Sequence, residues 1–165
     1  MPTTWARLCS SEQLEKALLM AGFSKVYEVA KGADITATLE AKEFEERMAR
    51  GEKLMTTSCC PAYVRAVHRH VPELDPCISD TKSPMHYIAE LAKKENPDAI
   101  TVFIGPCLAK RREGMDDDNV DYVLSAEELA AYFTAKNIDL LQIDAEEKPE
   151  NEKASKSGSR WIRES

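Results

Sequence analysis

Residues 57–63 read Thr57-Ser58-Cys59-Cys60-Pro61-Ala62-Tyr63. They stand where a β-branched stretch ends and a helical pattern begins. Proline suits the first position of a helix, because its missing N–H would have no partner there in any case. Cys60 is therefore expected at the N-cap, where the positive end of the helix dipole favours a thiolate that acts as a nucleophile or a metal ligand.

A second cysteine stands at the same kind of junction later in the chain. Cys107 follows Pro106 at the end of an apolar run. Strands alternate with helices along the sequence, which is typical of βαβ units and a mostly parallel sheet. Ligands of such sheets gather at the carboxyl ends of the strands. The sequence therefore predicts that Cys60 and Cys107 face one crevice.

The predicted fold is α/β, with a mostly parallel sheet of about four strands flanked by helices. The expected strands are 25–29, 53–57, 99–104, 121–124 and, at an edge, 140–143. The first expected helix begins after Ser10 or Ser11, the second ends before Gly51, and the third begins at Pro61. Two further helices are expected at 84–95 and 127–136. The helix before Gly51 is expected to bury an apolar face of Leu39, Ala41, Phe44 and Met48.

Length and composition favour one domain, or one lobe of a larger one, followed by a polar tail. The chain has 165 residues, of which 43% are hydrophobic, enough for a single core. Residues 1–143 are expected to form the α/β lobe. Residues 144–165 are rich in Glu, Lys, Ser and Asn, and we expect them to be disordered.

Charge and hydropathy exclude several classes of partner. The net charge is −7 and no basic stripe is present, which argues against nucleic acid. The sequence has no long apolar stretch and no signal-peptide layout, so we expect a cytoplasmic protein without membrane contact. Its five cysteines are then expected to be thiols or metal ligands. Cys9 and Cys77 have no motif around them and are expected to pack as small hydrophobic side chains.

The residues alone leave several chemistries open. The pair Cys59 and Cys60 fits packing, a strained disulfide, or one ligand beside one free thiol, whereas paired zinc spacing and a C-x-x-C motif are missing. Lys110 could bind an anionic ligand or lie in solvent. Glu40 and Glu43 share a helix face, as a step in a proton path or as solvated surface. The three histidines are expected at the surface or at helix ends.

Taken together, these segments resemble a known family. The segment 57–63, then Ser79 ahead of Lys82-Ser83-Pro84, and then Gly105-Pro106-Cys107-Leu108-Ala109-Lys110-Arg111-Arg112-Glu113 are similar to the first two signature segments of the catalytic domain of [FeFe]-hydrogenases, the iron-only hydrogenase large subunits. Weaker matches at 21–27, 33–35 and 120–125 extend the resemblance over roughly residues 12–143. One lobe of that catalytic domain is the expected fold.

The resemblance implies a role for seven residues. Cys60 and Cys107 match two of the four cysteines that hold the [4Fe–4S] part of the H-cluster. Cys59 matches the thiol that passes protons to the diiron subcluster, and Lys110 matches the lysine that bonds a cyanide ligand there. The proton path is matched by Ser79, Glu40 and Glu43. The implied chemistry is reversible proton reduction to hydrogen.

The departures from the family pattern matter as much as the matches. The third signature, which supplies the other two cluster cysteines, is absent from this sequence. Gly105 and Tyr63 replace the usual methionine and tryptophan, as in divergent and sensory branches. We therefore expect the chain alone to be inactive as a hydrogenase. Its partners would be the missing half of the catalytic domain or another subunit, and a ferredoxin-type electron donor. The alternatives are an iron–sulfur carrier or assembly protein, and a cofactor-free interaction domain.

Overall fold

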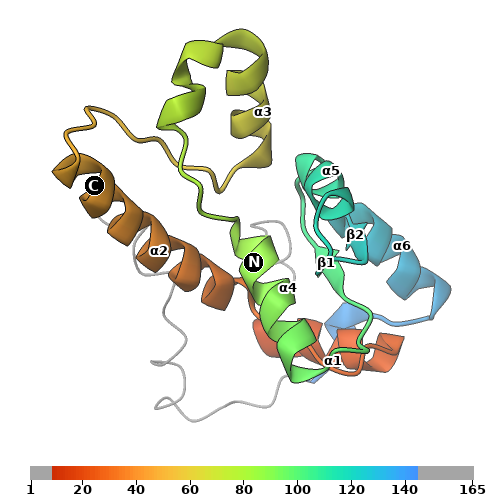
Figure 1. The fold of residues 1–165 in the computed structure, drawn as a ribbon. Helices are drawn as coiled ribbons and strands as arrows, with labels where there is room; N and C mark the ends of the chain where they lie inside the picture. Colours follow the sequence, from red (N-terminus) through yellow and green to blue (C-terminus); the bar gives the residue numbers. More distant parts are fainter. Residues whose placement is uncertain (1–8, 145–165) are drawn as a thin grey trace. The chain divides into compact units, whose positions relative to one another are not determined.

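A computed structural model describes residues 9–144 (Figure 1). The mixed α/β class is confirmed. The described residues divide into two compact units, the first comprising 9–27, 104–107 and 124–144, and the second comprising 28–103 and 108–123. Residues 145–165, which carry nearly all of the expected polar tail, lie outside the described residues.

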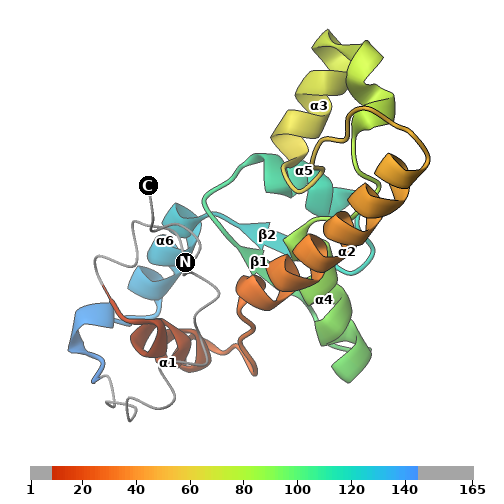
Figure 2. The ribbon, with the colours of Figure 1, turned by 90° about the vertical axis from the view of Figure 1, so that its left-hand side faces the viewer.

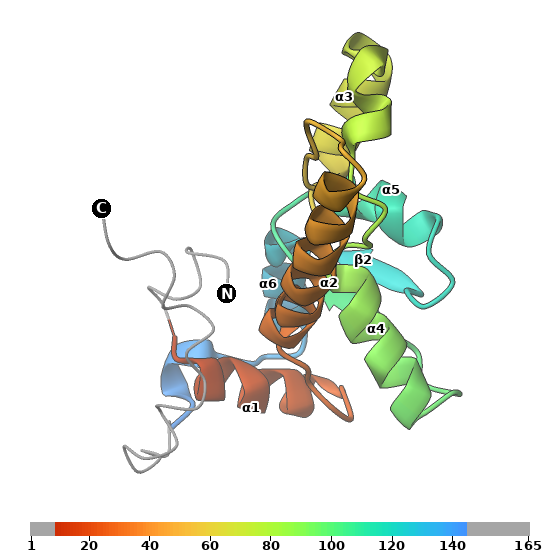
Figure 3. The same ribbon diagram turned by 60° about the vertical axis from the view of Figure 1, so that its left-hand side comes forward.

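The first unit contains the helices α1 (Ser11–Ala21) and α6 (Ala126–Ala135) and the short 3-10 helix η3 (Leu140–Gln142). Each α-helix starts with a capping box, in α1 between Ser10 and Gln13, so the expected start after Ser10 is confirmed. Gly22 ends α1 in the left-handed conformation, with φ of 109°. One core cluster joins the two helices, and its buried members are Cys9, Ala17, Leu18, Ala21, Ala126, Leu129 and Phe133. Figure 3 shows η3 beside α1.

Two expected strands in this unit are not strands. Residues 25–28 have no regular structure, and residue 29 already begins a helix. Their alternation has another cause, because Val26 packs against the core cluster while Lys25 stays exposed. At 140–143 the apolar side chains Leu140 and Ile143 both contact this cluster. A spacing of three suits a 3-10 turn, whose side chains at i and i+3 eclipse, and Asp139 caps that turn.

The second unit contains α2 (Val29–Ala49), α3 (Pro61–His70), the 3-10 helix η2 (Pro72–Cys77), α4 (Pro84–Glu95) and α5 (Ala109–Met115). α2 packs against α4, and Figure 1 shows the two helices side by side. Their closest approach is at Gly32, where an added Cβ would lie 2.2 Å from the carbonyl oxygen of Pro84. A second small core around Met85, Ala89 and Val120 lies on the other side of α4.

The inward face of α2 is polar, which corrects the expected apolar face. Leu39 and Phe44 are exposed by 39% and 48%, whereas Gly32, Thr36 and Arg47 are buried. The reason is that this face holds the loops 57–58 and 76–82 through hydrogen bonds rather than through apolar contact. Gly51 follows the helix with φ of 86°, as its sequence position predicts.

The sheet of the described residues has two strands, fewer than the four expected. β1 (Val102–Ile104) and β2 (Tyr122–Leu124) run parallel, as Figure 2 shows. The expected strand at 53–57 contributes one isolated parallel bridge, from Thr56 to Ile78. β1 is half-buried rather than fully buried, and Ile100 before it is 72% exposed. Within residues 9–144, no helix is both long and apolar enough to cross a bilayer.

Candidate functional site

Cys60 is the N-cap of α3 and Pro61 its first residue, as the sequence predicts. The Cys60 side chain is exposed and makes no capping hydrogen bond. Cys59 is half-buried, and both thiols are free rather than joined in a disulfide. The arrangement leaves the exposed thiol of Cys60 at the N-terminal end of α3, accessible to a ligand.

Glu40 anchors the segment that leads to this cysteine pair. Its Oε1 accepts a hydrogen bond from the Thr57 hydroxyl at 2.6 Å and another from the Ser58 N–H at 3.1 Å. The Cys59 N–H in turn donates to the Thr57 hydroxyl oxygen at 3.4 Å. The Ser58 hydroxyl donates to the carbonyl oxygen of Thr81. One carboxylate of α2 therefore fixes the loop that carries Cys59.

Glu43 binds the second loop, at residues 79–81. The Ser79 hydroxyl donates to Glu43 Oε2 at 2.5 Å, and the Thr81 hydroxyl donates to the same oxygen at 3.0 Å. The Asp80 N–H donates to Oε1 at 3.0 Å. Burial alone would raise the pKa of the Glu43 carboxyl. These three hydrogen bonds and the charge of Arg47 outweigh burial and lower the pKa to about 2.

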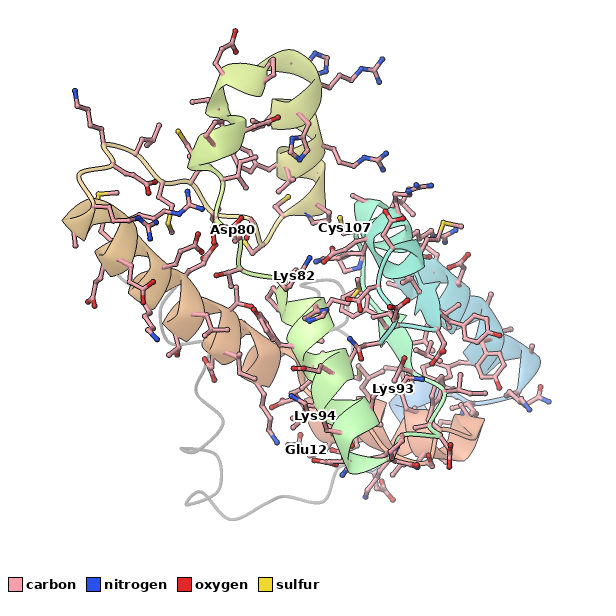
Figure 4. All side chains as sticks on the ribbon, viewed as in Figure 1. Glu12, Asp80, Lys82, Lys93, Lys94 and Cys107 are labelled. Carbon is pink, nitrogen blue, oxygen red and sulfur yellow. The ribbon has the colours of Figure 1, made fainter. Side chains whose placement is uncertain are left out.

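Arg47 is a member of this network that sequence reasoning missed. Its residue exposure is 6%, and its guanidinium contacts Glu43 Oε1 at 2.7 Å. It also donates to the carbonyl oxygens of Pro76 and Ile78 and pairs with Asp80 at 3.1 Å. The available signal was its i,i+4 spacing from Glu43 on one helix. Figure 4 labels Asp80 and Lys82 on the segment between η2 and α4 that this network holds.

Lys110, on α5, is held rather than solvated. Its side chain is 13% exposed, and its Nζ donates to Ser83 Oγ at 2.8 Å and to Glu113 Oε2 at 2.6 Å. An ammonium group has three N–H donors, so these two partners leave one donor for a further acceptor. Ser83 is buried at the N-cap of α4. Ser83 and Glu113 lie in the quoted motifs, but nothing in the motifs pairs them with Lys110.

Cys107 belongs to the first unit, whereas every other predicted site residue belongs to the second. Its side chain is exposed just after β1. The convergence of Cys60 and Cys107 therefore stays a prediction. Cys9 is buried in the first core, which raises the pKa of its thiol, and its expected packing role is confirmed. Cys77 is half-buried. In residues 9–144, no three Cys, His, Asp or Glu side chains form a set that could hold a metal ion.

Two of the three histidines lie beside a carboxylate within the second unit. His68 Nδ1 lies 2.7 Å from Asp75 at the surface, and His86 Nδ1 lies 2.8 Å from Asp117. His70 ends α3 and is exposed. None of the three contacts the loops 57–60 or 79–81 through a described hydrogen bond.

Comparisons with known proteins identify the family. Residues 4–163 match the family described as "Iron only hydrogenase large subunit, C-terminal domain". The chain is 31% identical over 147 residues to iron hydrogenase 1 of Clostridium pasteurianum, an alignment that covers 79% of this chain. It is also 31% identical over 108 residues, or 64% of this chain, to the cytosolic Fe–S cluster assembly factor NAR1 of Kluyveromyces lactis.

Solved structures agree with the sequence comparison. An apo [FeFe]-hydrogenase from Chlamydomonas reinhardtii matches with a TM-score of 0.75 and 30% identity, covering 86% of this chain and 40% of that one. The chain spans 26% of the clostridial relative and 22% of the assembly factor. These matches cover most of the present chain at a consistent level of identity. The chain therefore belongs to the family of the C-terminal domain of iron-only hydrogenase large subunits.

Proposed function

We propose that this chain is one lobe of an [FeFe]-hydrogenase-like catalytic domain, and that it carries the proton-relay side of the active site. The observation that supports this best is the arrangement on α2. Glu43 accepts the Ser79 hydroxyl at 2.5 Å, and Glu40, three residues earlier, holds the loop of Cys59. The two carboxylates lie on one face of α2. Together with the Cys59 thiol and the Ser79 hydroxyl, they are groups that can donate or accept a proton.

The proposed relay residues fall into two hydrogen-bonded groups. The backbone N–H of Cys59 is linked to Glu40 through the Thr57 hydroxyl, and the Ser79 hydroxyl donates to Glu43. Side chains three residues apart on a helix are neighbours, so a side-chain rotation or one bridging water would join the two groups at the two glutamates. In this proposal Cys59 is the proton donor nearest the reacting centre. Lys110 offers its remaining N–H donor to an anionic ligand.

The donor set for the cluster is incomplete in the described residues. A [4Fe–4S] cluster is held by four cysteine thiolates. Cys60 and Cys107 have the exposure that a ligand needs, but no group of three possible ligands is present in residues 9–144. We propose that these two cysteines supply half of the ligands. The other half would come from a further polypeptide segment, either the rest of the catalytic domain or another subunit.

It follows that the isolated chain should not evolve hydrogen. The test is anaerobic co-production with hydrogenase maturation proteins, followed by a hydrogen assay with a reduced viologen dye. A full-length iron hydrogenase matured in parallel is the positive control. The proposal expects no hydrogen from this chain alone. Hydrogen evolution that disappears in Cys59→Ala would contradict it. We propose that a ferredoxin-type protein supplies electrons to the completed enzyme.

A second candidate is an iron–sulfur carrier or assembly function, favoured by the 31% identity to the assembly factor of K. lactis. Such a function needs cluster ligands but neither a thiol proton donor nor a cation for a cyanide ligand. Cys59 and Lys110 are both present and both held in place, which favours the hydrogenase-like lobe. Cluster transfer to an apo acceptor protein that is unaffected by Cys59→Ala and Lys110→Met would favour the carrier. A third alternative, a cofactor-free interaction domain, predicts no bound iron at all.

A further inference from the structure

Thr81 is not one of the proposed relay residues, yet it is hydrogen-bonded to two of them and to the loop that carries Cys59. Its hydroxyl donates to Glu43 Oε2 at 3.0 Å, and its N–H donates to Ser79 Oγ at 3.1 Å. Its carbonyl oxygen accepts the Ser58 hydroxyl from the cysteine loop. The residue is 9% exposed, so water competes little for these groups.

The Thr81 N–H decides which way the Ser79 hydroxyl points. A hydroxyl oxygen that accepts a hydrogen bond still has its own hydrogen to donate. Because Thr81 donates to Ser79 Oγ at 3.1 Å, the hydrogen of that hydroxyl is free for Glu43 Oε2 at 2.5 Å. The hydrogen bonds therefore run in one direction, from the Thr81 backbone through Ser79 to Glu43.

The Thr81 hydroxyl then gives the same carboxylate oxygen a second donor. Hydrogen bonds to the ionised form of a carboxyl favour that form. We propose that Thr81 is a positioning residue that sets the basicity of Glu43, by keeping its Oε2 doubly hydrogen-bonded and Ser79 oriented as a donor. This rests on the proposed function, because Glu43 is relevant only if it takes part in proton transfer.

The other charged groups around Glu43 are accounted for. Arg47 lies 2.7 Å from Glu43 Oε1, on the oxygen that Thr81 does not contact. Asp80 and Glu52 pair with Arg47 at 3.1 Å and 3.5 Å, and Glu40 binds the loop at 57–58. These groups are unchanged when only the Thr81 hydroxyl is removed. The Thr81 hydrogen bond is among the causes that lower the pKa of Glu43.

The test is a carboxyl titration of Glu43 by carbon-13 NMR in the full chain, which needs neither cluster nor activity. Thr81→Val removes the hydroxyl at nearly constant volume, and Thr81→Ser keeps it. We expect the valine variant to raise the titration midpoint by about one unit, a roughly tenfold gain in proton affinity. The serine variant should titrate like wild type. Thr38→Val is the matched control, because the Thr38 hydroxyl binds a carbonyl of the same helix away from Glu43.

Equal midpoints for wild type and Thr81→Val would overturn the proposal, and so would a shift that Thr81→Ser fails to reverse. If the valine variant does not fold, Thr81→Ala removes the same hydroxyl and the same comparison decides. Circular dichroism at each pH identifies the range in which the chain stays folded. Failure here would leave the proposed hydrogenase-like function standing. A result against the proposed function in the hydrogen or cluster experiment would leave the titration result unaffected.

Discussion

Glu43 and Ser79 are 36 residues apart in sequence, and the Ser79 hydroxyl donates to Glu43 Oε2 at 2.5 Å. The bond joins the middle of α2 to the loop that precedes α4. Arg47, one turn further along α2, pairs with the other oxygen of the same carboxylate. An ion pair between the buried Arg47 guanidinium and the partly buried Glu43 carboxylate is thus the centre of the hydrogen-bond network that holds the loop 76–82, and it includes a residue of the proposed proton relay.

Glu43→Gln should destabilise the fold strongly. The substitution leaves the guanidinium of Arg47, 6% exposed, without its nearest carboxylate. Breaking a buried ion pair by removing one partner costs about 3 kcal/mol or more. Urea denaturation measures this as a lower free energy of unfolding. Glu40→Gln is the control and should cost about 1 kcal/mol, because Glu40 contacts no buried charge and one of its two hydrogen bonds is exposed. Equal losses in the two variants would contradict the assignment of Glu43 as the centre.

The free energy of unfolding should decrease as the pH is lowered, in a window set by Glu43. Its pKa is lowered from 4.5 to about 2 in the folded chain, so the unfolded chain binds the proton more tightly. The stabilisation is therefore present above about pH 4.5 and is lost as the pH falls toward 2. Asp121, hydrogen-bonded by Lys93 and Thr101, has a pKa lowered to about 2 and acts in the same direction. Thermal melts from pH 6 to pH 2.5 should show this slope, and a flatter slope in Glu43→Gln. An unchanged slope in that variant would argue against the Glu43 contribution.

Gly32→Ala should destabilise the packing of α2 on α4. Helix propensity alone would make the change stabilising by about 1 kcal/mol. The new Cβ would however lie 2.2 Å from the Pro84 carbonyl oxygen, a backbone atom that cannot rotate away. Forcing the helices apart should cost about 2 kcal/mol net. The sign of the change in unfolding free energy decides between the two effects. A stabilised variant would show that the helices are further apart than described.

Thr57→Val should loosen the loop of Cys59. The Thr57 hydroxyl links Glu40 Oε1 at 2.6 Å to the Cys59 N–H. Losing a hydrogen bond of about 1 kcal/mol should raise the alkylation rate of Cys59 roughly fivefold. The rate is measured by mass spectrometry in a Cys60→Ser background, so that one thiol of the segment reacts. Thr57→Ser keeps the hydroxyl and should keep the slow rate. Equal rates for the valine and serine variants would contradict an anchoring role.

Local signals made part of this structure predictable. The cap at Ser10 and the start of α3 at Pro61 are set by neighbouring residues, and both are confirmed. The polar inward face of α2 was not predictable in the same way. It depends on loops that reach Glu43 and Arg47 from 29 to 38 residues away.

The candidate site also has residues that could be predicted from the sequence and residues that could not. The roles of Cys59 and of the two glutamates came from the family resemblance of their segments, because their spacing alone left packing and solvated surface open. Thr81 carries no motif of its own, and Arg47 is marked only by its i,i+4 spacing from Glu43. Their contacts with Glu43 in the structure reveal both residues. The apolar spacing at 140–143 was compatible with a strand or a turn. Its contacts with the first core decide for the turn.

We propose Cys60 and Cys107 as two of the ligands of one iron–sulfur cluster. The most direct measurement is anaerobic reconstitution with iron, sulfide and an external thiol that supplies the remaining ligands, followed by iron analysis and electron paramagnetic resonance. Wild type is compared with Cys60→Ser, Cys107→Ser and, as the control, Cys77→Ser. We expect a cluster signal in wild type and in Cys77→Ser, and its loss in each of the other two variants. The same iron content in all four proteins, whether full or zero, would contradict it.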